Sequence, residues 1–511
     1  MAIAVSVAIK LKVRGYVAAK DDFSLATVDM MALFEVPEIE ALATSIPANT
    51  IKIESTVIDG NTPAVRTVLK YADDQEKVRV LEEVSKPAGS GERYQTAVRR
   101  LIRLNIFKLM YQITGYTPGP WGIMRGVRPT KLVHRLLDEG LDSSQVIGQL
   151  SADYAVSQEK ARLLTDIALR QRPFLLSPED KRRVSLYIGI PYCLSRCLYC
   201  SFPSAVIPDN RQDVVNLLAA LETDILAAAA VIEKYDLIVD SLYIGGGTPT
   251  SLNEEDFGTI LNLVKSKLVM AATREFTVEA GRPDSTNEAK ILAMYQAGVT
   301  RISVNPQTMQ EKTLKLIGRN HNVRDIISMF QKIRQIGIAI INMDIIIGLP
   351  GENEADLKDT LEQIAALAPD NLTVHTLALK RGSRLMESAV GLSLSQKGLA
   401  SKQLVIADHY AAKMGMVPYY LYRQKNMAGN LENVGYTLPG KECLYNIQII
   451  DERQTIIGIG PTAATKAIVP GDHKLSSSYN PKDIRSYINN LNTHLQRREA
   501  LLANLFKAKE E

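Results

Sequence analysis

The middle of the chain alternates short apolar runs with longer segments that are apolar on one face only. Runs of roughly four to eight apolar residues predict buried strands, and apolar residues recurring every three or four positions predict helices. The predicted strands are 186–190, 241–245, 275–280, 301–304, 341–347 and 372–377, and the clearest helices are 214–233, 257–268 and 357–367. Strands alternating with helices favour a parallel sheet with right-handed crossovers. The pattern therefore predicts an α/β fold, a partial (β/α)6 barrel over residues 176–385.

A different pattern precedes this barrel and predicts an α+β N-terminal module over residues 1–175. Apolar residues alternate with others over 1–16, as in a strand, and a hairpin is predicted over 51–71 with its turn at Asp59-Gly60-Asn61. Apolar residues at helical spacing then predict a long helix from about 91 to 114. A second helical stretch runs to about residue 141, and a proline-containing, charged segment over 172–183 is interpreted as a linker.

Basic residues stand between the two predicted helices of this module. Arg125, Arg128 and Lys131 lie in this short stretch. They either meet carboxylates or are solvated at the entrance of a helix, and the sequence favours the second interpretation.

After the barrel the rhythm of the chain changes again. A helix is predicted near 402–414, an aromatic segment covers 419–423, and a helical tail follows. We expect a mostly helical C-terminal lobe over residues 386–511.

Composition narrows the class of protein. The chain has 511 residues, 46% of them hydrophobic, and a formal net charge of +4. Because the chain has no run of 18 or more apolar residues, no membrane span is expected. The alternation over 1–16 is a strand pattern, not a signal-peptide core, so a cytoplasmic location is expected. A net charge this small is no evidence for nucleic acid as a partner.

Three of the four cysteines stand together, as Cys193-Leu-Ser-Arg-Cys197-Leu-Tyr-Cys200, after the first barrel strand. Three thiolates on one loop can hold three irons of a [4Fe–4S] cluster and leave the fourth iron open. A structural zinc site usually has four N/S ligands, and the remaining cysteine, Cys443, is distant in the sequence. A disulfide scaffold is typical of short secreted chains. Zinc or inert buried thiols remain as the alternatives to the cluster.

Further candidate residues follow the other predicted strands, at the edge where barrels of this kind carry their functional side chains. Glycines in the segment 245–250 let the backbone approach a ligand, although a plain turn has the same composition. Glu279 can accept hydroxyl hydrogen bonds or cap the next helix. Gln307 ends the fourth strand. Arg319 suits bidentate pairing with a carboxylate, and Asp344 is a charge in an apolar strand, which is costly unless paired or functional.

The CxxxCxxC spacing after the first strand resembles the signature of radical S-adenosylmethionine (SAM) enzymes. In that family, SAM binds the open iron and is cleaved to a 5′-deoxyadenosyl radical. Over roughly residues 180–470 the motifs resemble the oxygen-independent coproporphyrinogen III oxidase family, most closely its HemZ-type branch (coproporphyrinogen dehydrogenase). The resemblance implies a [4Fe–4S] cluster on Cys193, Cys197 and Cys200. It implies SAM contacts by Tyr187, Gly246, Gly247, Thr248, Glu279, Gln307, Arg319, Asp344 and Ala378.

The sequence also departs from the family. Gly189 stands where the best-studied oxidases have histidine, and Phe202 stands where they have a further cysteine. The haem-contact motif of the related haem chaperones is missing, and the single tryptophan is Trp121. Cys443 fits the HemZ-type branch and could matter without being a cluster ligand, but a buried apolar thiol is the favoured interpretation.

The resemblance implies a function in haem and porphyrin biosynthesis. We expect oxidative decarboxylation of coproporphyrinogen III to protoporphyrinogen IX without oxygen, with an unidentified electron donor as partner. Arg282, Arg423 and Lys425 are the candidates to pair with the carboxylates of this porphyrinogen substrate. The alternatives are a haem-binding, chaperone-like protein and another radical SAM enzyme that acts on a tetrapyrrole.

Overall fold

The computed structural model describes residues 14–18, 26, 30, 38–39, 50–58, 63–72, 78–85, 92–126, 128–378, 383, 385, 395–424, 427–468 and 475–506. The chain divides into two compact units, residues 1–126 with 133–165, and residues 127–132 with 166–511. Most of the strand predicted over 1–16 and the predicted turn Asp59-Gly60-Asn61 lie outside the described residues. The division into three domains at 175 and 385 stays a prediction.

The first unit contains a five-stranded sheet in the order β2-β1-β3-β4-β5. Its elements are β1 (Arg14–Ala18), β2 (Glu38–Ile39), β3 (Thr50–Ile58), β4 (Ala64–Ala72), β5 (Val78–Ser85), α2 (Tyr94–Thr114) and α4 (Ser143–Tyr154). The predicted hairpin is confirmed, because β3 and β4 pair antiparallel from Ile51–Tyr71 to Ile58–Ala64. The predicted long helix is confirmed as α2, which contributes the largest share of a core that also includes buried residues of β3 and β4.

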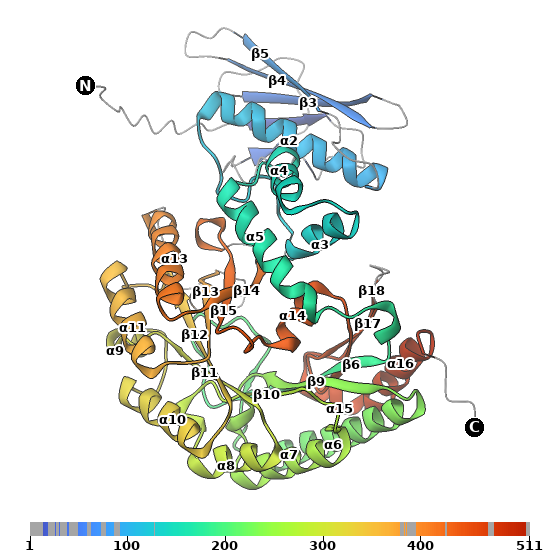
Figure 1. Ribbon diagram of the computed structural model, residues 1–511, viewed down its shortest axis with the longest axis vertical. Helices are drawn as coiled ribbons and strands as arrows, with labels where there is room; N and C mark the ends of the chain where they lie inside the picture. The colour runs from blue at the N-terminus through green and yellow to red at the C-terminus, as the bar shows by residue number, and fades with distance from the viewer. Residues whose placement is uncertain are drawn as a thin grey trace. The chain divides into compact units, whose positions relative to one another are not determined.

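The second unit is built on one large sheet. Six strands, β6 (Arg183–Ile190), β9 (Ile238–Gly246), β10 (Glu275–Glu279), β11 (Arg301–Gln307), β12 (Ile340–Ile347) and β13 (Asn371–Thr376), are parallel neighbours in this order. The helices between them are α6 (Arg211–Lys234), α7 (Glu254–Leu268), α8 (Glu288–Ala297), α9 (Glu311–Leu316), α10 (Val323–Ile336) and α11 (Glu354–Leu367). These helices line the outside of the curved sheet (Figure 1). The α/β fold with a partial barrel is thus confirmed.

Asparagine begins five of these helices. The side chains of Asn210, Asn253, Asn287, Asn322 and Asn353 each accept a backbone N–H from the first turn of α6, α7, α8, α10 and α11 respectively. Such N-caps satisfy donors that have no partner within the helix. Each cap therefore fixes where a helix starts. The loops that run from the end of each strand to the next capping asparagine remain free to adopt irregular conformations.

The C-terminal part of the second unit extends the sheet at both edges. Strands β14 (Val417–Tyr422) and β15 (Asn433–Thr437) continue it beyond β13, and β16 (Thr455–Ile459), β17 (Ala464–Ile468) and β18 (Leu475–Tyr479) continue it beyond β6. The helices of this part are α13 (Ser395–Lys413), α14 (Leu444–Asp451), α15 (Ile484–Asn489) and α16 (Leu491–Ala503). The helices agree with the predicted mostly helical segment. The strands were not predicted, because each spans only five or six residues, and β15 and β16 join the sheet by pairing with β13 and β6, which are distant in the sequence.

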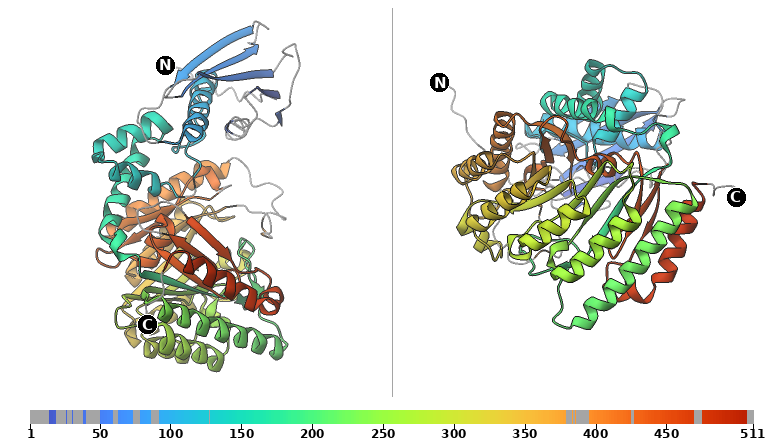
Figure 2. Two further views of the ribbon diagram at one scale, coloured as in Figure 1. Left: turned by 90° about the vertical axis from the view of Figure 1, so that its right-hand side faces the viewer. Right: turned by 60° about the horizontal axis from the view of Figure 1, so that its bottom comes forward.

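Helix α6 is, by length and composition alone, apolar enough to cross a membrane. In the structure it lies beside α16 (Figure 2), and Lys234 near its end pairs with Glu499 of α16 at 2.6 Å. A helix on the outside of a sheet is expected to be apolar along its packed face. The expectation that the chain has no membrane span stays a prediction.

Two of the basic residues of segment 125–131 meet a carboxylate. Arg128 and Lys131 lie 2.5 and 2.6 Å from the carboxylate oxygens of Glu452, which is largely buried. The carboxylate interpretation of these two residues is confirmed, and the favoured alternative, solvation, is wrong for them. Glu452 lies more than 300 residues away, so no local sequence pattern indicates this pairing.

Candidate active site

The carboxyl ends of the parallel strands surround a cavity of about 520 Å³. Every one of the twelve predicted cluster and SAM residues lines it: Tyr187, Cys193, Cys197, Cys200, Gly246, Gly247, Thr248, Glu279, Gln307, Arg319, Asp344 and Ala378. Because the carboxyl ends of parallel strands meet at one edge, residues spread over almost 200 positions come together. Their individual roles stay predictions.

The cysteine loop follows β6 and is tied to its surroundings by backbone hydrogen bonds. Cys193 ends the short strand β7 (Tyr192–Cys193), which pairs with β8 (Ala205–Val206). The backbone N–H of Leu198 donates to the carbonyl of Ile317 at 3.0 Å, which holds the middle of the loop. All three thiols are free, and that of Cys197 is the most buried. No three metal-ligating side chains of the described residues are already gathered closely enough to hold a metal ion.

A glycine turn faces the cysteine loop. Gly246 has φ +117°, a conformation that side chains rarely adopt. A Cβ atom on Gly247 would lie 2.5 Å from the carbonyl oxygen of Tyr192 and 3.0 Å from the sulfur of Cys193. The neighbouring Thr248 directs its hydroxyl at the same sulfur, at 3.5 Å. The turn therefore lies against the cysteine loop with no room for a side chain.

Glu279 lies at the end of β10 with an aromatic wall beside it. The hydroxyl of Tyr243 donates to its carboxylate at 2.7 Å, and the ring of Tyr243 stacks on those of Tyr187 and Tyr445. Burial raises the pKa of Glu279 to about 7, although the Tyr243 hydrogen bond lowers it. The carboxyl thus changes charge near neutral pH.

Two residues that line the cavity each have a buried polar atom without a partner among the described residues. Gln307 is a non-glycine residue with φ +68°, and its buried side-chain carbonyl oxygen accepts no hydrogen bond. Arg319 donates to the carbonyl oxygens of Gly281 and Asn305 and to the hydroxyl of Tyr199, but its buried Nε has no acceptor. Strained backbone and unsatisfied buried polar atoms are costly, and they concentrate at ligand sites.

Asp344 is paired with a histidine that sequence reasoning did not single out. One carboxylate oxygen of Asp344 accepts from the amide of Asn342 at 2.6 Å, and the other lies 3.4 Å from Nε2 of His375. The other ring nitrogen of His375 lies 3.2 Å from the hydroxyl of Tyr422. All four side chains line the cavity. The available signal was that His375 lies on the same strand face as Thr373, one position before the end of β13.

The three candidate partners of substrate carboxylates fare differently. Arg282 lines the cavity, but its guanidinium is already paired with Asp284 at 2.6 Å. Arg423 is buried outside the cavity lining and binds the backbone and side chain of Asn430. Lys425 lies outside the described residues. The structure thus places Arg423 in loop stabilisation, where the sequence suggested substrate binding.

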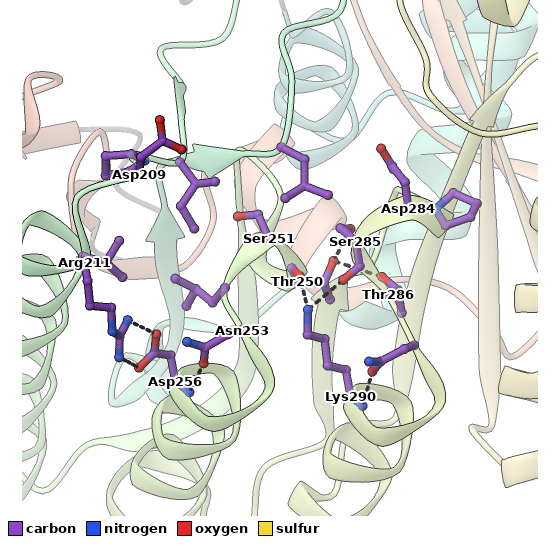
Figure 3. A pocket seen from close by; sticks show the side chains of 17 residues that line it. Asp209, Arg211, Thr250, Ser251, Asn253, Asp256, Asp284, Ser285, Thr286 and Lys290 are labelled. Carbon is purple, nitrogen blue, oxygen red and sulfur yellow. Dashed lines mark hydrogen bonds and ion pairs between the residues drawn. The ribbon is translucent and has the colours of Figure 1, made fainter.

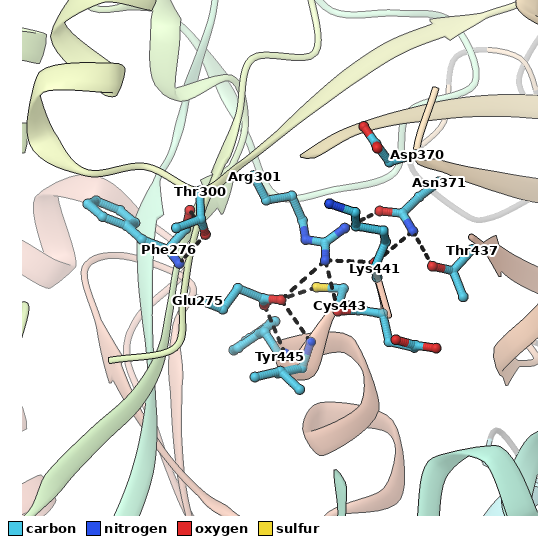
Figure 4. A network of polar contacts seen from close by, with 12 residues as sticks. Glu275, Phe276, Thr300, Arg301, Asp370, Asn371, Thr437, Lys441, Cys443 and Tyr445 are labelled. Atoms are coloured by element: carbon cyan, nitrogen blue, oxygen red, sulfur yellow. Dashed lines mark hydrogen bonds and ion pairs between the residues drawn. The ribbon is translucent and has the colours of Figure 1, made fainter. Parts of the chain in front are cut away.

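Cys443 belongs to a buried polar network at the opposite end of the strands (Figure 4). Its thiol donates to the carboxylate of Glu275 at 3.2 Å, and Glu275 also accepts the backbone N–H groups of Leu444 and Tyr445 at the start of α14. Arg301 completes the network by donating to the backbone carbonyls of Lys441 and Glu442. Burial raises the pKa of the Cys443 thiol, so it stays neutral. Cys443 is therefore a structural thiol that helps to fix α14.

The residues present fit a cluster with SAM. Three thiols on one loop line the cavity, and the glycine turn packs its backbone directly against that loop. Gln307 and Arg319 offer an unpaired acceptor and an unpaired donor to a ligand with both kinds of group. No fourth thiol lies at this cavity among the described residues, since Cys443 is committed to Glu275.

Comparisons with known proteins agree with this site. A sequence profile of the Radical SAM superfamily matches residues 187–364. The oxygen-independent coproporphyrinogen-III oxidase-like protein HemZ of Bacillus subtilis (strain 168) is 41% identical over 394 residues, which cover 76% of this chain and 78% of that protein. The heme chaperone HemW of the same organism is 34% identical over 215 residues, 42% of this chain and 54% of that protein.

Among solved structures, coproporphyrinogen III oxidase (HemN) from Escherichia coli, described as a radical SAM enzyme, superposes with a TM-score of 0.51. The match covers 65% of this chain and 73% of that chain at 22% identity. At this identity the likeness concerns the fold.

Proposed function

Because this chain belongs to the family of radical SAM proteins that includes HemZ, and so uses a [4Fe–4S] cluster and SAM, we propose that it decarboxylates coproporphyrinogen III to protoporphyrinogen IX without oxygen. When bound, the cluster and SAM supply a 5′-deoxyadenosyl radical. In the proposed reaction a hydrogen atom leaves the β-carbon of a propionate side chain. Carbon dioxide and one electron are then lost, the electron to an external acceptor, and a vinyl group remains. The reaction occurs at two propionates.

The observation that carries this proposal is the composition of the cavity wall. Its lining includes the cysteine loop, the glycine turn and Glu279, which we assign to the cluster and SAM. It also includes aromatic rings: Tyr243 and Tyr445 are stacked with centroids 4.6 Å apart, and the planes of Tyr420 and Tyr422 differ by only 4°. Flat apolar faces suit a substrate built of pyrrole rings.

Charge at the same wall suits an acidic substrate. Arg196, Arg282 and Arg319 are the arginines among the described residues that line the cavity. In a partly enclosed cavity, fixed positive charge favours carboxylates more strongly than it does in water. The protein's contribution would be to position the propionate and exclude water, since the cofactor supplies the difficult step.

The similarity to a heme chaperone supports a second candidate, a haem-binding protein that keeps the cluster but does not decarboxylate. The two candidates predict different products. An oxidase converts the porphyrinogen and consumes SAM, whereas a chaperone binds haem stoichiometrically and leaves the porphyrinogen intact.

The test is an anaerobic assay with reconstituted protein, SAM, a reductant and coproporphyrinogen III, followed by mass spectrometry. The proposal predicts stepwise loss of two formic-acid equivalents, each accompanied by 5′-deoxyadenosine, and no product with Cys197→Ser. SAM cleavage beside an unchanged porphyrinogen would overturn the substrate assignment. Tight haem binding without any SAM cleavage would favour the second candidate.

A further inference from the structure

A chain of charged side chains lies directly behind the cysteine loop. Arg282 follows β10, and its guanidinium pairs with both carboxylate oxygens of Asp284 at 2.9 and 2.6 Å. Nδ1 of His321, which precedes α10, lies 3.6 Å from the same carboxylate. The sequence suggested Arg282 as a partner of the substrate, whereas Asp284 and His321 do not line the cavity and have no part in the proposed reaction.

Arg282 contacts the loop as well as Asp284. Its Nη1 donates to the carbonyl oxygen of Ser195 at 3.0 Å and lies 4.0 Å from the sulfur of Cys197. Arg282 is only 3% exposed, and Cys197 is 8% exposed. The guanidinium is therefore a fixed, buried positive charge beside the most buried of the three thiols.

The carboxylate of Asp284 is a fixed negative charge next to it. Burial alone would raise the pKa of Asp284, but its contacts with His321 and Arg282 lower that pKa below the usual range, so the group stays ionised. Asp284 also lies at the edge of a second cavity, of about 460 Å³ (Figure 3). The pair thus places opposite charges at different distances from the cysteine loop, with the positive one nearer.

We propose that Arg282 is a positioning residue that clamps the cysteine loop and raises the reduction potential of the cluster, and that Asp284 limits this rise. Reduction adds one electron to the cluster and makes or breaks no bond. Positive charge near a cluster and hydrogen bonds to its sulfurs stabilise the reduced form. The inference rests on the three cysteines being ligands, and it does not depend on the identity of the substrate.

Opposite effects of two substitutions follow from this arrangement. Arg282→Gln removes the near positive charge and leaves the Asp284 carboxylate without its guanidinium partner, so the potential falls. Asp284→Asn leaves Arg282 unpaired, so the potential rises. Damage to the loop alone would not shift the potential in opposite directions, which separates this tuning from a merely structural role.

The experiment is a potentiometric titration of the full-length, reconstituted protein, followed by electron paramagnetic resonance. It is done anaerobically with dithionite as electron donor and without SAM or porphyrinogen. We expect the ratio of reduced to oxidised cluster at a fixed potential to change about tenfold in each variant, which corresponds to about 59 mV for one electron. Arg282→Lys, which keeps the charge, should remain closest to the unmodified protein.

A matched control stands at the other end of the same strand. Arg274 precedes β10 and pairs with both carboxylate oxygens of Asp240 at 2.8 and 2.6 Å, outside the cavity lining. Arg274→Gln should leave the potential unchanged.

Unchanged potentials in both test variants, or shifts in the same direction, would overturn the proposal. If Arg282→Gln fails to load iron, the reduction potential of Asp284→Asn tests the proposal alone. A higher potential than in the unmodified protein supports the proposal, and an unchanged or lower potential overturns it. Iron content, measured in every sample, tests the cysteine ligands separately. Decarboxylation takes no part in the measurement, so failure of the proposed function would leave the result interpretable.

Discussion

The charge of Glu279 should control the affinity for SAM near neutral pH. We propose that this carboxylate accepts the ribose hydroxyl groups, and its burial raises its pKa to about 7. Its hydrogen bond from Tyr243 and the nearby His375 lower the pKa, whereas Asp344 raises it. Because the pKa lies above the usual value for glutamate, the carboxylate is lost as the pH falls through 7, where an ordinary glutamate would remain ionised.

The size of the effect follows from the ionised fraction. With a pKa of about 7, about 90% of Glu279 is ionised at pH 8 and about 10% at pH 6. If only the carboxylate binds well, affinity should fall about tenfold between these pH values. Glu279→Gln is neutral at every pH and should bind SAM at least about tenfold more weakly, since hydrogen bonds to a charged group contribute about 1.5–3 kcal/mol.

The assay is equilibrium dialysis of SAM against the anaerobic, cluster-loaded protein between pH 6 and 8. SAM itself also titrates, so its affinity depends on pH even without Glu279. The contribution of Glu279 is therefore the difference between the pH dependence of SAM affinity in the unmodified protein and that in Glu279→Gln. Glu352→Gln is the control: burial raises the pKa of Glu352 too, but this residue bonds to Thr308 and does not line the cavity. Equal slopes in the unmodified protein and in Glu279→Gln would refute the reasoning.

Three further predictions concern the same site. Cys197→Ala should lose the cluster, whereas Cys443→Ala should keep its full iron content. Cys443→Ala should also lose about 1–3 kcal/mol of unfolding free energy, because its hydrogen bond to Glu275 is lost. Iron analysis and denaturant unfolding check both variants, and iron loss in Cys443→Ala would contradict the prediction. Arg319→Lys should weaken SAM binding about tenfold with unchanged iron, because lysine cannot form the bidentate pair; dialysis that shows unaltered affinity would reject the carboxylate role. Gly247→Ala should abolish SAM cleavage, since its Cβ atom would clash with the backbone oxygen of Tyr192. Gly258→Ala is the control: it lies in α7, its Cβ atom would meet nothing within 4 Å, and the variant should cleave SAM and be about 1 kcal/mol more stable.

The barrel and its functional edge could be predicted because both follow from local sequence patterns, namely the apolar runs of the strands and the order of strands and helices. Strands such as β12 are apolar runs that end in a turn signal, and the order of strands and helices implies where the carboxyl ends lie. Once the topology is parallel, side chains that follow strands must meet. The cavity lining therefore includes residues as distant in the sequence as Cys193 and Ala378.

What could not be predicted depends on pairings between distant segments. The interaction of Arg282 with Asp284 is local, but its contact with Ser195 depends on how two loops approach, so the sequence suggested a substrate role. Arg423 looked equally available, yet its hydrogen bonds to Asn430 place it in a loop. Charge alone cannot distinguish a cation that awaits a ligand from one that already has a partner.

The most direct test of the account follows a single hydrogen atom. Coproporphyrinogen III deuterated at the β-carbons of its propionates is incubated anaerobically with the reconstituted protein, SAM and reductant, and 5′-deoxyadenosine is analysed by mass spectrometry. The account predicts that one molecule of 5′-deoxyadenosine forms for each vinyl group, and that each of these molecules carries a single deuterium. Unlabelled 5′-deoxyadenosine beside unchanged porphyrinogen would contradict it.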